Sequence, residues 1–335
     1  MYPPSDLLTP VLVPPLRYRL LRFLRLSAVY LGVVLLLVFA VRLAPLGQIW
    51  ELLTHLALWQ LGALLLINIF VVACMTARWW LILRAEHPRL PFLRLVGYRL
   101  AAFGLSYFTF GPQVGGEPLQ VIYLRRYHGL TLGRAASAVL MDKLLEFLGN
   151  FVFITLGLFA AARIGLPAAS WLPLALLLLW PAVHILLLSR GRLPLSGLLC
   201  LLFPSQRRQK WLRLIMVSER LASSFTRRHP AALFSALAMS LLAWMGMAAE
   251  YLLMLGFLDA HLNVLEGLAG LTAATLAFLV PVPAGLGALE ASQVLALGTL
   301  GYSPALAIGL ALLLRGRDIL NGGLGLLLAA RSFAR

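Results

Sequence analysis

Long uninterrupted blocks of apolar residues are the feature of this sequence that most constrains its fold. They are Leu26–Val41, Leu56–Ala77, Phe147–Ala162, Trp171–Ser189 and Ala231–Ala249. A helix needs roughly 20 apolar residues to cross a ~30 Å hydrocarbon core, and lipid offers no partner for a free backbone N–H or C=O group. Only 12% of the residues are charged, well below the share in a soluble protein. The sequence therefore predicts an all-α, polytopic helical membrane protein.

The basic residues are distributed unevenly, although the net charge is +16. They gather in a lead at 1–25, in 78–99, in 125–134 and in 190–228, whereas the other connecting segments carry few. This is the positive-inside pattern, and it predicts a multi-pass protein of the cell (inner or plasma) membrane with both termini in the cytoplasm. Nucleic acid is not expected as a partner, because no basic domain with interleaved aromatic residues lies outside the predicted spans.

We expect one transmembrane domain over 26–330, with about six full spans and two re-entrant hairpins. The predicted spans are 26–41, 54–77, 135–162, 171–189, 231–257 and 304–330. The hairpins, 97–124 and 264–300, are apolar stretches interrupted by proline and glycine. Irregular backbone at membrane depth is tolerated only where protein buries it or it lines a polar cavity. Counting each hairpin leg as a full span would instead require seven to ten crossings.

The cytoplasmic basic segment 190–230 contains an amphipathic pattern. Its apolar residues share one helical face opposite a basic one: Trp211, Leu214, Ile215, Ala222 and Phe225. Such a helix is typical of one that lies on a membrane surface. A cytoplasmic linker with a solvated charged face is the alternative.

The two hairpins resemble each other, which predicts an inverted repeat with motifs at 97–162 and 264–330. A breaker containing proline and glycine leads to Glu117 in the first and to Glu290 in the second. A charged residue, Asp142 or Arg315, then stands 25 residues after the glutamate inside an alanine-rich helix. Inverted repeats with broken helices that meet near the midplane are a recurrent transporter architecture.

Charged residues inside predicted spans are the candidates for substrate binding and translocation, because each costs at least ~2.5–3.5 kcal/mol on insertion scales. Together with two breaker glycines, the candidates are Glu117, Asp142, Lys143, Glu146, Glu250, Gly285, Gly287, Glu290, Arg315, Arg317 and Asp318. One hypothesis places them around a polar cavity at the repeat interface, with Asp142 and Arg315 lining it or pairing across it. The other makes them internal ion pairs, with Lys143–Glu146 and Arg315–Asp318 favoured by spacing.

The breakers themselves allow two interpretations. Gly285 and Gly287 could let backbone amides approach a lipid phosphate, as helix N-termini bind anions, or they could form a bare turn. Glu117 and Glu290 stand in the first turn after their breakers, where a carboxylate also caps a helix.

Motifs of known enzymes are missing from the sequence. It has no HExxH, no GxSxG, no Walker loop and no dinucleotide fingerprint, and its two cysteines, Cys74 and Cys200, cannot form a CxxC metal site. We therefore expect no catalytic residues, no metal, no cofactor and no ATP-driven step, and a protein that is not an enzyme.

Two stretches resemble a known family. Residues 281–315, PVPAGLGALEASQVLALGTLGYSPALAIGLALLLR, and residues 115–143, GGEPLQVIYLRRYHGLTLGRAASAVLMDK, are similar to motifs of the flippase-like integral membrane family. That family includes the transmembrane region of lysylphosphatidylglycerol synthetases, and the similarity spans about 26–330. Two departures are Asp142-Lys143 where the family commonly has Asp-Arg, and Ala284-Gly285 in place of a glycine pair.

The resemblance implies ATP-independent translocation, by flipping or export, of a polar lipid between membrane leaflets. The implied partners are membrane lipids, an anionic phospholipid or another polar lipid, with a homo-oligomer left open. Two alternatives stay open. One is a membrane enzyme or enzyme subunit acting on a lipid-linked intermediate, with Glu117, Asp142 or Glu290 as acid or base. The other is a scaffold that recruits cytoplasmic lipid enzymes through 190–230.

Overall fold

The computed structural model describes residues 54–87, 89–109, 115–164, 179–202, 210–280 and 282–334, and within them the chain forms helices and short connections without a strand. The helices are α3 (Leu58–Glu86), α4 (Phe92–Phe108), α5 (Glu117–His128), α6 (Leu132–Arg163), α8 (Trp180–Ser189), α9 (Pro194–Leu202), α10 (Lys210–Arg228), α11 (Pro230–Phe257), α12 (Val264–Ala277), the 3₁₀ turn η3 (Pro283–Gly285), α13 (Ala288–Thr299) and α14 (Pro304–Ala334). The all-α prediction is confirmed for this part of the chain.

Helix ends follow from local sequence. Asn263 caps α12, because its Oδ1 accepts from the Glu266 amide at 3.0 Å while the Glu266 carboxylate accepts from the Asn263 amide at 2.8 Å. Gly129 ends α5 in the left-handed region with φ 65°, and Gly287 precedes α13 with φ 77°. Glycine adopts such angles without a steric penalty.

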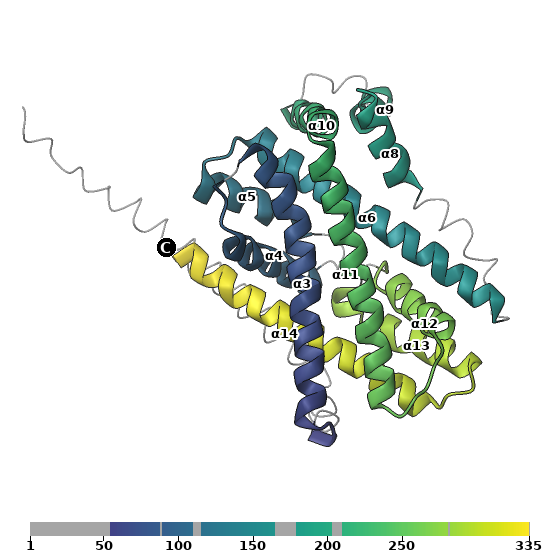
Figure 1. The fold of residues 1–335 in the computed structure, drawn as a ribbon. Coiled ribbons are helices and arrows are strands. Elements are labelled where there is room, and N and C mark those ends of the chain that lie inside the picture. Colours follow the sequence, from purple (N-terminus) through teal and green to yellow (C-terminus); the bar gives the residue numbers. More distant parts are fainter. Residues whose placement is uncertain are drawn as a thin grey trace, which may run out of the picture.

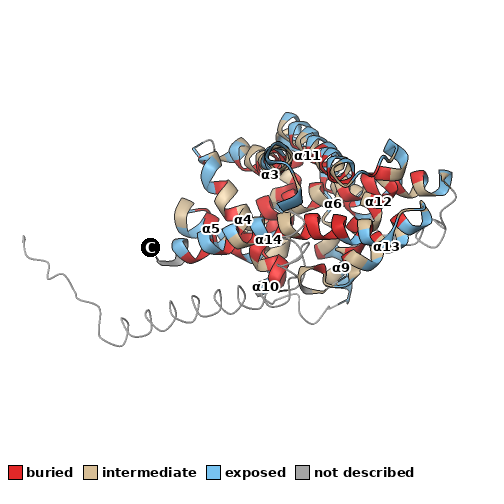
Figure 2. Ribbon diagram, turned by 90° about the horizontal axis from the view of Figure 1, so that it is seen from below, coloured by how far each residue is buried: buried red, intermediate tan, exposed pale blue. Residues whose placement is uncertain are grey.

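Two long helices, α3 and α11, run side by side through the centre of the molecule (Figure 1). Beside them α4 packs on α14, and α12 packs on α6. Small residues allow both of these contacts: Gly104 faces the backbone of Gly322, and Gly157 faces the side chain of Thr272. Figure 2 shows buried residues along the inner faces of α14, α6 and α12, with exposed residues on the outer faces.

Three of the described helices, α3, α6 and α11, are long and apolar enough to cross a membrane. The pair α8 and α9 passes the same test only when taken together, and it bends by 107°. Helix α14 is as long, but its middle carries the charges at 315–318. Of the predicted spans, 26–41 lies outside the described residues and 171–189 lies only partly within them.

The predicted apolar face of α10 is partly covered by protein. Leu212, Ala222 and Phe225 are buried where α10 packs against α6 and α8, whereas Trp211 is 39% exposed. Of the five residues of the predicted apolar face, Ala222 and Phe225 are therefore turned to neighbouring helices, whereas Trp211 is exposed and Leu214 and Ile215 are half-buried.

Candidate substrate cavity

A first charged cluster joins α3, α4 and α6. Arg78 on α3 is buried and donates from Nε to Oδ1 of Asp142 at 2.7 Å and from Nη2 to Oε2 of Glu146 at 2.8 Å. Arg99 on α4 donates from Nη2 to the other Asp142 oxygen at 2.5 Å. Both Asp142 oxygens thus accept from arginine, as a buried carboxylate requires.

The same cluster extends to α5 through Lys143. Its Nζ lies 2.8 Å from Oε1 of Glu146 and 3.2 Å from Oε1 of Glu117. The second oxygen of Glu117 accepts from the backbone amide of Gly115 at 2.8 Å. Glu117 therefore satisfies a free amide at the helix start and also ties α5 to α6.

A second charged cluster joins α11, α13 and α14. Arg317 donates from Nη1 to Oε2 of Glu250 at 2.7 Å and from Nη2 to Oδ1 of Asp318 at 2.8 Å. Arg315 forms an ion pair with Glu290. Glu290 repeats the double role of Glu117, because its other oxygen accepts from the amide of Gly287 at 3.0 Å.

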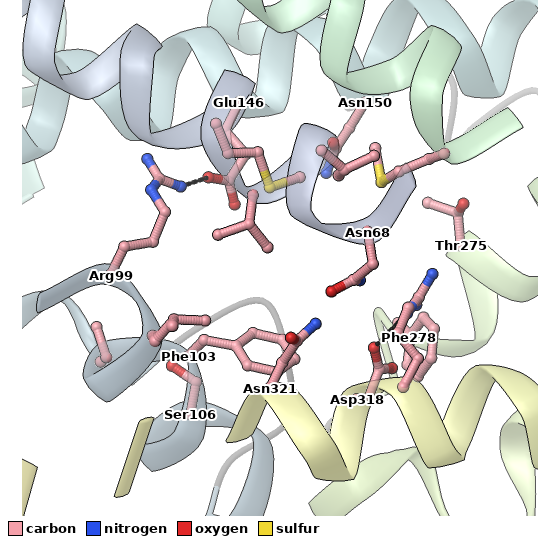
Figure 3. Close-up of a pocket in the computed structure, with 18 of the residues that line it drawn as sticks. Asn68, Arg99, Phe103, Ser106, Glu146, Asn150, Thr275, Phe278, Asp318 and Asn321 are labelled. Carbon is pink, nitrogen blue, oxygen red and sulfur yellow. Dashed lines mark hydrogen bonds and ion pairs between the residues drawn. The ribbon is translucent and has the colours of Figure 1, made fainter. Parts of the chain in front are cut away.

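A cavity of about 210 Å³ lies between the two clusters. It is bordered by charged residues of both, by amide and hydroxyl side chains, and by apolar residues from several helices. Its polar lining consists of Asn68, Arg99, Ser106, Glu117, Gln120, Lys143, Glu146, Asn150, Glu250, Thr275, Arg317, Asp318 and Asn321. In Figure 3, Asn68 and Asn321 lie in the middle of the cavity, between the Arg99–Glu146 pair and Asp318.

The sequence-based candidates divide into two groups. Those that line the cavity are Glu117, Lys143, Glu146, Glu250, Arg317 and Asp318, while Asp142, Gly285, Gly287, Glu290 and Arg315 are not among its lining residues. The hypothesis that Asp142 and Arg315 line the cavity or pair across it is wrong, because each is engaged by partners in its own cluster. The pair Lys143–Glu146 is confirmed, and Asp318 pairs with Arg317 instead of Arg315.

The breaker glycines act within their own turn. The amide of Gly287 donates to Glu290, and the amide of Gly285 donates to the carbonyl oxygen of Val282 at 3.0 Å. Neither glycine amide is therefore free for a lipid phosphate, as the turn interpretation expects. Ala284 shares this turn with a φ of 55°, so the position where the family commonly has glycine is a left-handed one here.

Sequence reasoning missed several residues of the site. The positive-inside pattern placed Arg78 and Arg99 in a cytoplasmic basic segment, but in the structure both side chains form ion pairs with Asp142. Asn68, Gln120 and Asn150 gave no signal, since a single amide in an apolar helix has no periodic pattern. A search for every polar residue inside the predicted spans and hairpins would have found all three.

A separate buried polar cluster holds α8, α9 and α10 together. The Glu219 carboxylate accepts from the backbone amides of Leu195 and Ser196 at 2.8 Å each and from the Ser196 hydroxyl, and it lies 3.1 Å from His184 Nε2. Burial alone would raise the pKa of the Glu219 carboxyl, but these hydrogen bonds outweigh it and hold the pKa below its usual range.

The family of this chain is identified by a match over most of its length. The model of the lysylphosphatidylglycerol synthase TM region matches residues 23–322. The chain belongs to this family. The matched residues, 23–322, include both charged clusters and the whole cavity lining. Membership of the lysylphosphatidylglycerol synthase TM region family makes this chain a membrane protein with a lipid-related role. No curated protein and no solved structure matches the chain.

Proposed function

We propose that this protein translocates a polar lipid between membrane leaflets without ATP. The observation that carries the proposal is a cavity between two charged clusters, lined by apolar residues together with charged and amide side chains, in a chain of a lipid-related membrane family. Polar and ionisable groups inside a membrane domain are costly, and they usually mark a substrate path. The lipid headgroup would pass through the cavity while the acyl chains stay in the bilayer.

We further infer the inverted repeat. Helices α3, α4, α5 and α6 have 29, 17, 12 and 32 residues, and α11, α12, α13 and α14 have 28, 14, 12 and 31. The short helix before each break packs on the last helix of the other set, α4 on α14 and α12 on α6. This exchange supports two related halves around the cavity.

The repeat gives the proposal a topology. The pairs α4–α5 and α12–α13 would be re-entrant hairpins that enter from opposite sides, within six spans of a cell-membrane protein whose termini are both cytoplasmic. Movement of one half against the other would then open the cavity alternately to the two leaflets, as in other inverted-repeat transporters. The ion pairs within each half would stay closed during this motion.

Catalysis is not part of the proposal. Each carboxylate that lines the cavity, from Glu117, Glu146, Glu250 or Asp318, lies within ion-pair distance of an arginine or lysine. Each of these carboxylates therefore already has a charged partner within the protein, as in a structural ion pair. This favours transport over the alternative of a membrane enzyme.

The test is lipid translocation in liposomes that contain only purified protein and lipid. Fluorescent lipids are placed in both leaflets, and an impermeant quencher is added outside without ATP. Quenching that proceeds beyond the outer leaflet, faster than in protein-free liposomes, is the expected result. Quenching that stops at the outer leaflet for every headgroup tried would contradict the proposal.

A further inference from the structure

The charged residues that line the cavity are already paired with one another. Three cations, Arg99, Lys143 and Arg317, stand against four carboxylates, and every one of the seven is in an ion pair. A phosphate would have to compete for a cation that holds two carboxylates. An ammonium group would have to compete for a carboxylate that already has a cation. The charged side chains therefore line the cavity as ion pairs, and they do not form an open site for a charged ligand.

Four neutral amide side chains also line the cavity. Asn68 comes from α3, Gln120 from α5, Asn150 from α6 and Asn321 from α14. These amides come from both halves of the molecule. Figure 3 shows two of them, Asn68 and Asn321, between the Arg99–Glu146 pair and Asp318. An amide side chain both donates and accepts, so the set suits a ligand that does the same.

Four atoms of the lining residues lack a hydrogen-bond partner among the described residues. Two are acceptors, Oε1 of Gln120 and Oε1 of Glu250, and two are donors, Nδ2 of Asn150 and Nε of Arg99. Gln120, Asn150 and Glu250 are each at least 95% buried. Buried polar atoms in native proteins nearly always have a partner, so these atoms point to a ligand.

The mixture of donors and acceptors selects the chemistry of that ligand. A phosphate group alone would satisfy the two donors only, and an ammonium group alone would satisfy the two acceptors only. A zwitterionic headgroup would bring both groups, but each would have to compete with the ion pairs described above. A hydroxyl group donates and accepts at once, so neighbouring hydroxyls can satisfy all four atoms without bringing a charge. The cavity, at about 210 Å³, far exceeds the ~10–15 Å³ that holds one water.

Resting on the translocation function above, we propose that the cavity binds a lipid whose headgroup is a neutral polyol, a sugar foremost. Gln120 and Glu250 accept from its hydroxyls, and Asn150 and Arg99 donate to them. The ion pairs around them remain intact.

The test measures binding and transport of matched lipids. Binding is followed by native mass spectrometry in a detergent without a sugar headgroup, with glucosyl-diacylglycerol, phosphatidylcholine, phosphatidylethanolamine and phosphatidylglycerol. The glucosyl lipid should bind at least about tenfold more tightly than the other three. Equal affinities, or tightest binding of any of the other three lipids, would overturn the proposal.

Variants assign the preference to the cavity. Gln120→Leu and Asn150→Leu should each weaken glucosyl-lipid binding about tenfold, because they leave ligand hydroxyls unpaired, while phosphatidylcholine binding stays unchanged. Gln293→Leu is the matched control. Gln293 is equally buried and also three residues after a breaker glutamate, but it bonds Tyr251 and Gly270 and does not line the cavity. The Gln293→Leu variant should be less stable, but the ratio of its affinities for the glucosyl lipid and for phosphatidylcholine should equal that of wild type. If this ratio is also unchanged in Gln120→Leu and Asn150→Leu, the proposal is wrong.

Two further arms separate the ways in which the idea could fail. Methyl glucoside should not displace the glucosyl lipid at equal concentration; full displacement would assign the cavity to a soluble sugar. In liposomes, transport of all lipids without preference would refute the polyol inference and leave translocation standing. Selective binding of the glucosyl lipid without any transport would support the binding site and refute translocation.

Discussion

Arg78 Nε lies 2.7 Å from Oδ1 of Asp142, and the two side chains are only 2% and 1% exposed. The residues are 64 positions apart in the chain, so the pair joins α3 to α6 in the interior of the molecule. With Arg99 and Glu146, both of which line the cavity, it forms one connected set of charges. Because these groups are paired, they can stay ionised in the protein interior, where burial of a single unpaired charge would cost several kcal/mol.

Breaking this pair should destabilise the protein strongly. Asp142→Asn leaves Arg78 and Arg99 without their shared carboxylate, and loss of one partner of a buried pair costs about 3–5 kcal/mol. The free energy of unfolding, measured by denaturant titration in micelles, should fall by about that amount. Arg89→Gln, at an exposed position, is the control and should change little. An equal loss of unfolding free energy in Asp142→Asn and Arg89→Gln would contradict this role of the buried pair.

How far could this site be foreseen? The helix expected at 231–257 is observed at Pro230–Phe257, because a long apolar run ends at polar residues and can only be a helix in lipid. The breaks around Glu117 and Glu290 were equally visible, since proline and glycine interrupt helices by their backbone geometry.

Ion-pair partners on different helices could not be predicted from the sequence. Arg78 and Arg99 follow an apolar run, so they looked like positive-inside residues, and only the packing of α6 against α3 and α4 gives them Asp142. Asp142 and Arg315 stand at matching positions, 25 residues after Glu117 and Glu290, but they do not pair with each other. Asp142 binds Arg78 and Arg99, and Arg315 binds Glu290. Spacing along one helix fixes neighbours on that helix alone, which is why Lys143–Glu146 was foreseen.

The close contact of α4 with α14 should depend on Gly104. A Cβ at this position would meet the carbonyl group of Gly322, and overpacking of this kind costs about 1–3 kcal/mol. Gly104→Ala should therefore lower the free energy of unfolding by roughly that amount. Gly62→Ala is the matched control, because no atom lies within 4 Å of its added methyl group. It should be neutral or stabilise the protein by up to ~1 kcal/mol through helix propensity, and a loss at Gly62 as large as that at Gly104 would refute the packing argument.

The cluster around Glu219 should make stability depend on pH. Its pKa is lower in the folded protein than in the unfolded chain, so the unfolded chain binds more protons as pH falls. The stabilisation is therefore complete above the usual carboxyl pKa of about 4.3 and is lost as pH falls through the folded value.

Glu219→Gln tests this dependence. At pH 7 the variant should be less stable by about 1.5–3 kcal/mol, the value of hydrogen bonds to a charged group, and the difference should shrink as pH falls below about 4. Melting temperatures across this range measure it, with Glu86→Gln at an exposed position as control. A difference between wild type and Glu219→Gln that is constant with pH would contradict the assignment.

The central claim, that lipid headgroups pass through the cavity between the two clusters, is tested most directly by filling that cavity. Asn321 lines it near the middle (Figure 3), while the neighbouring Leu320 is 50% exposed on the outside of the same helix. Lipid translocation should be measured in liposomes with wild type, Asn321→Trp and Leu320→Trp, after each has been shown to be folded. The account predicts that Asn321→Trp falls to the rate of protein-free liposomes and that Leu320→Trp keeps the wild-type rate. Unimpaired translocation by folded Asn321→Trp would contradict it.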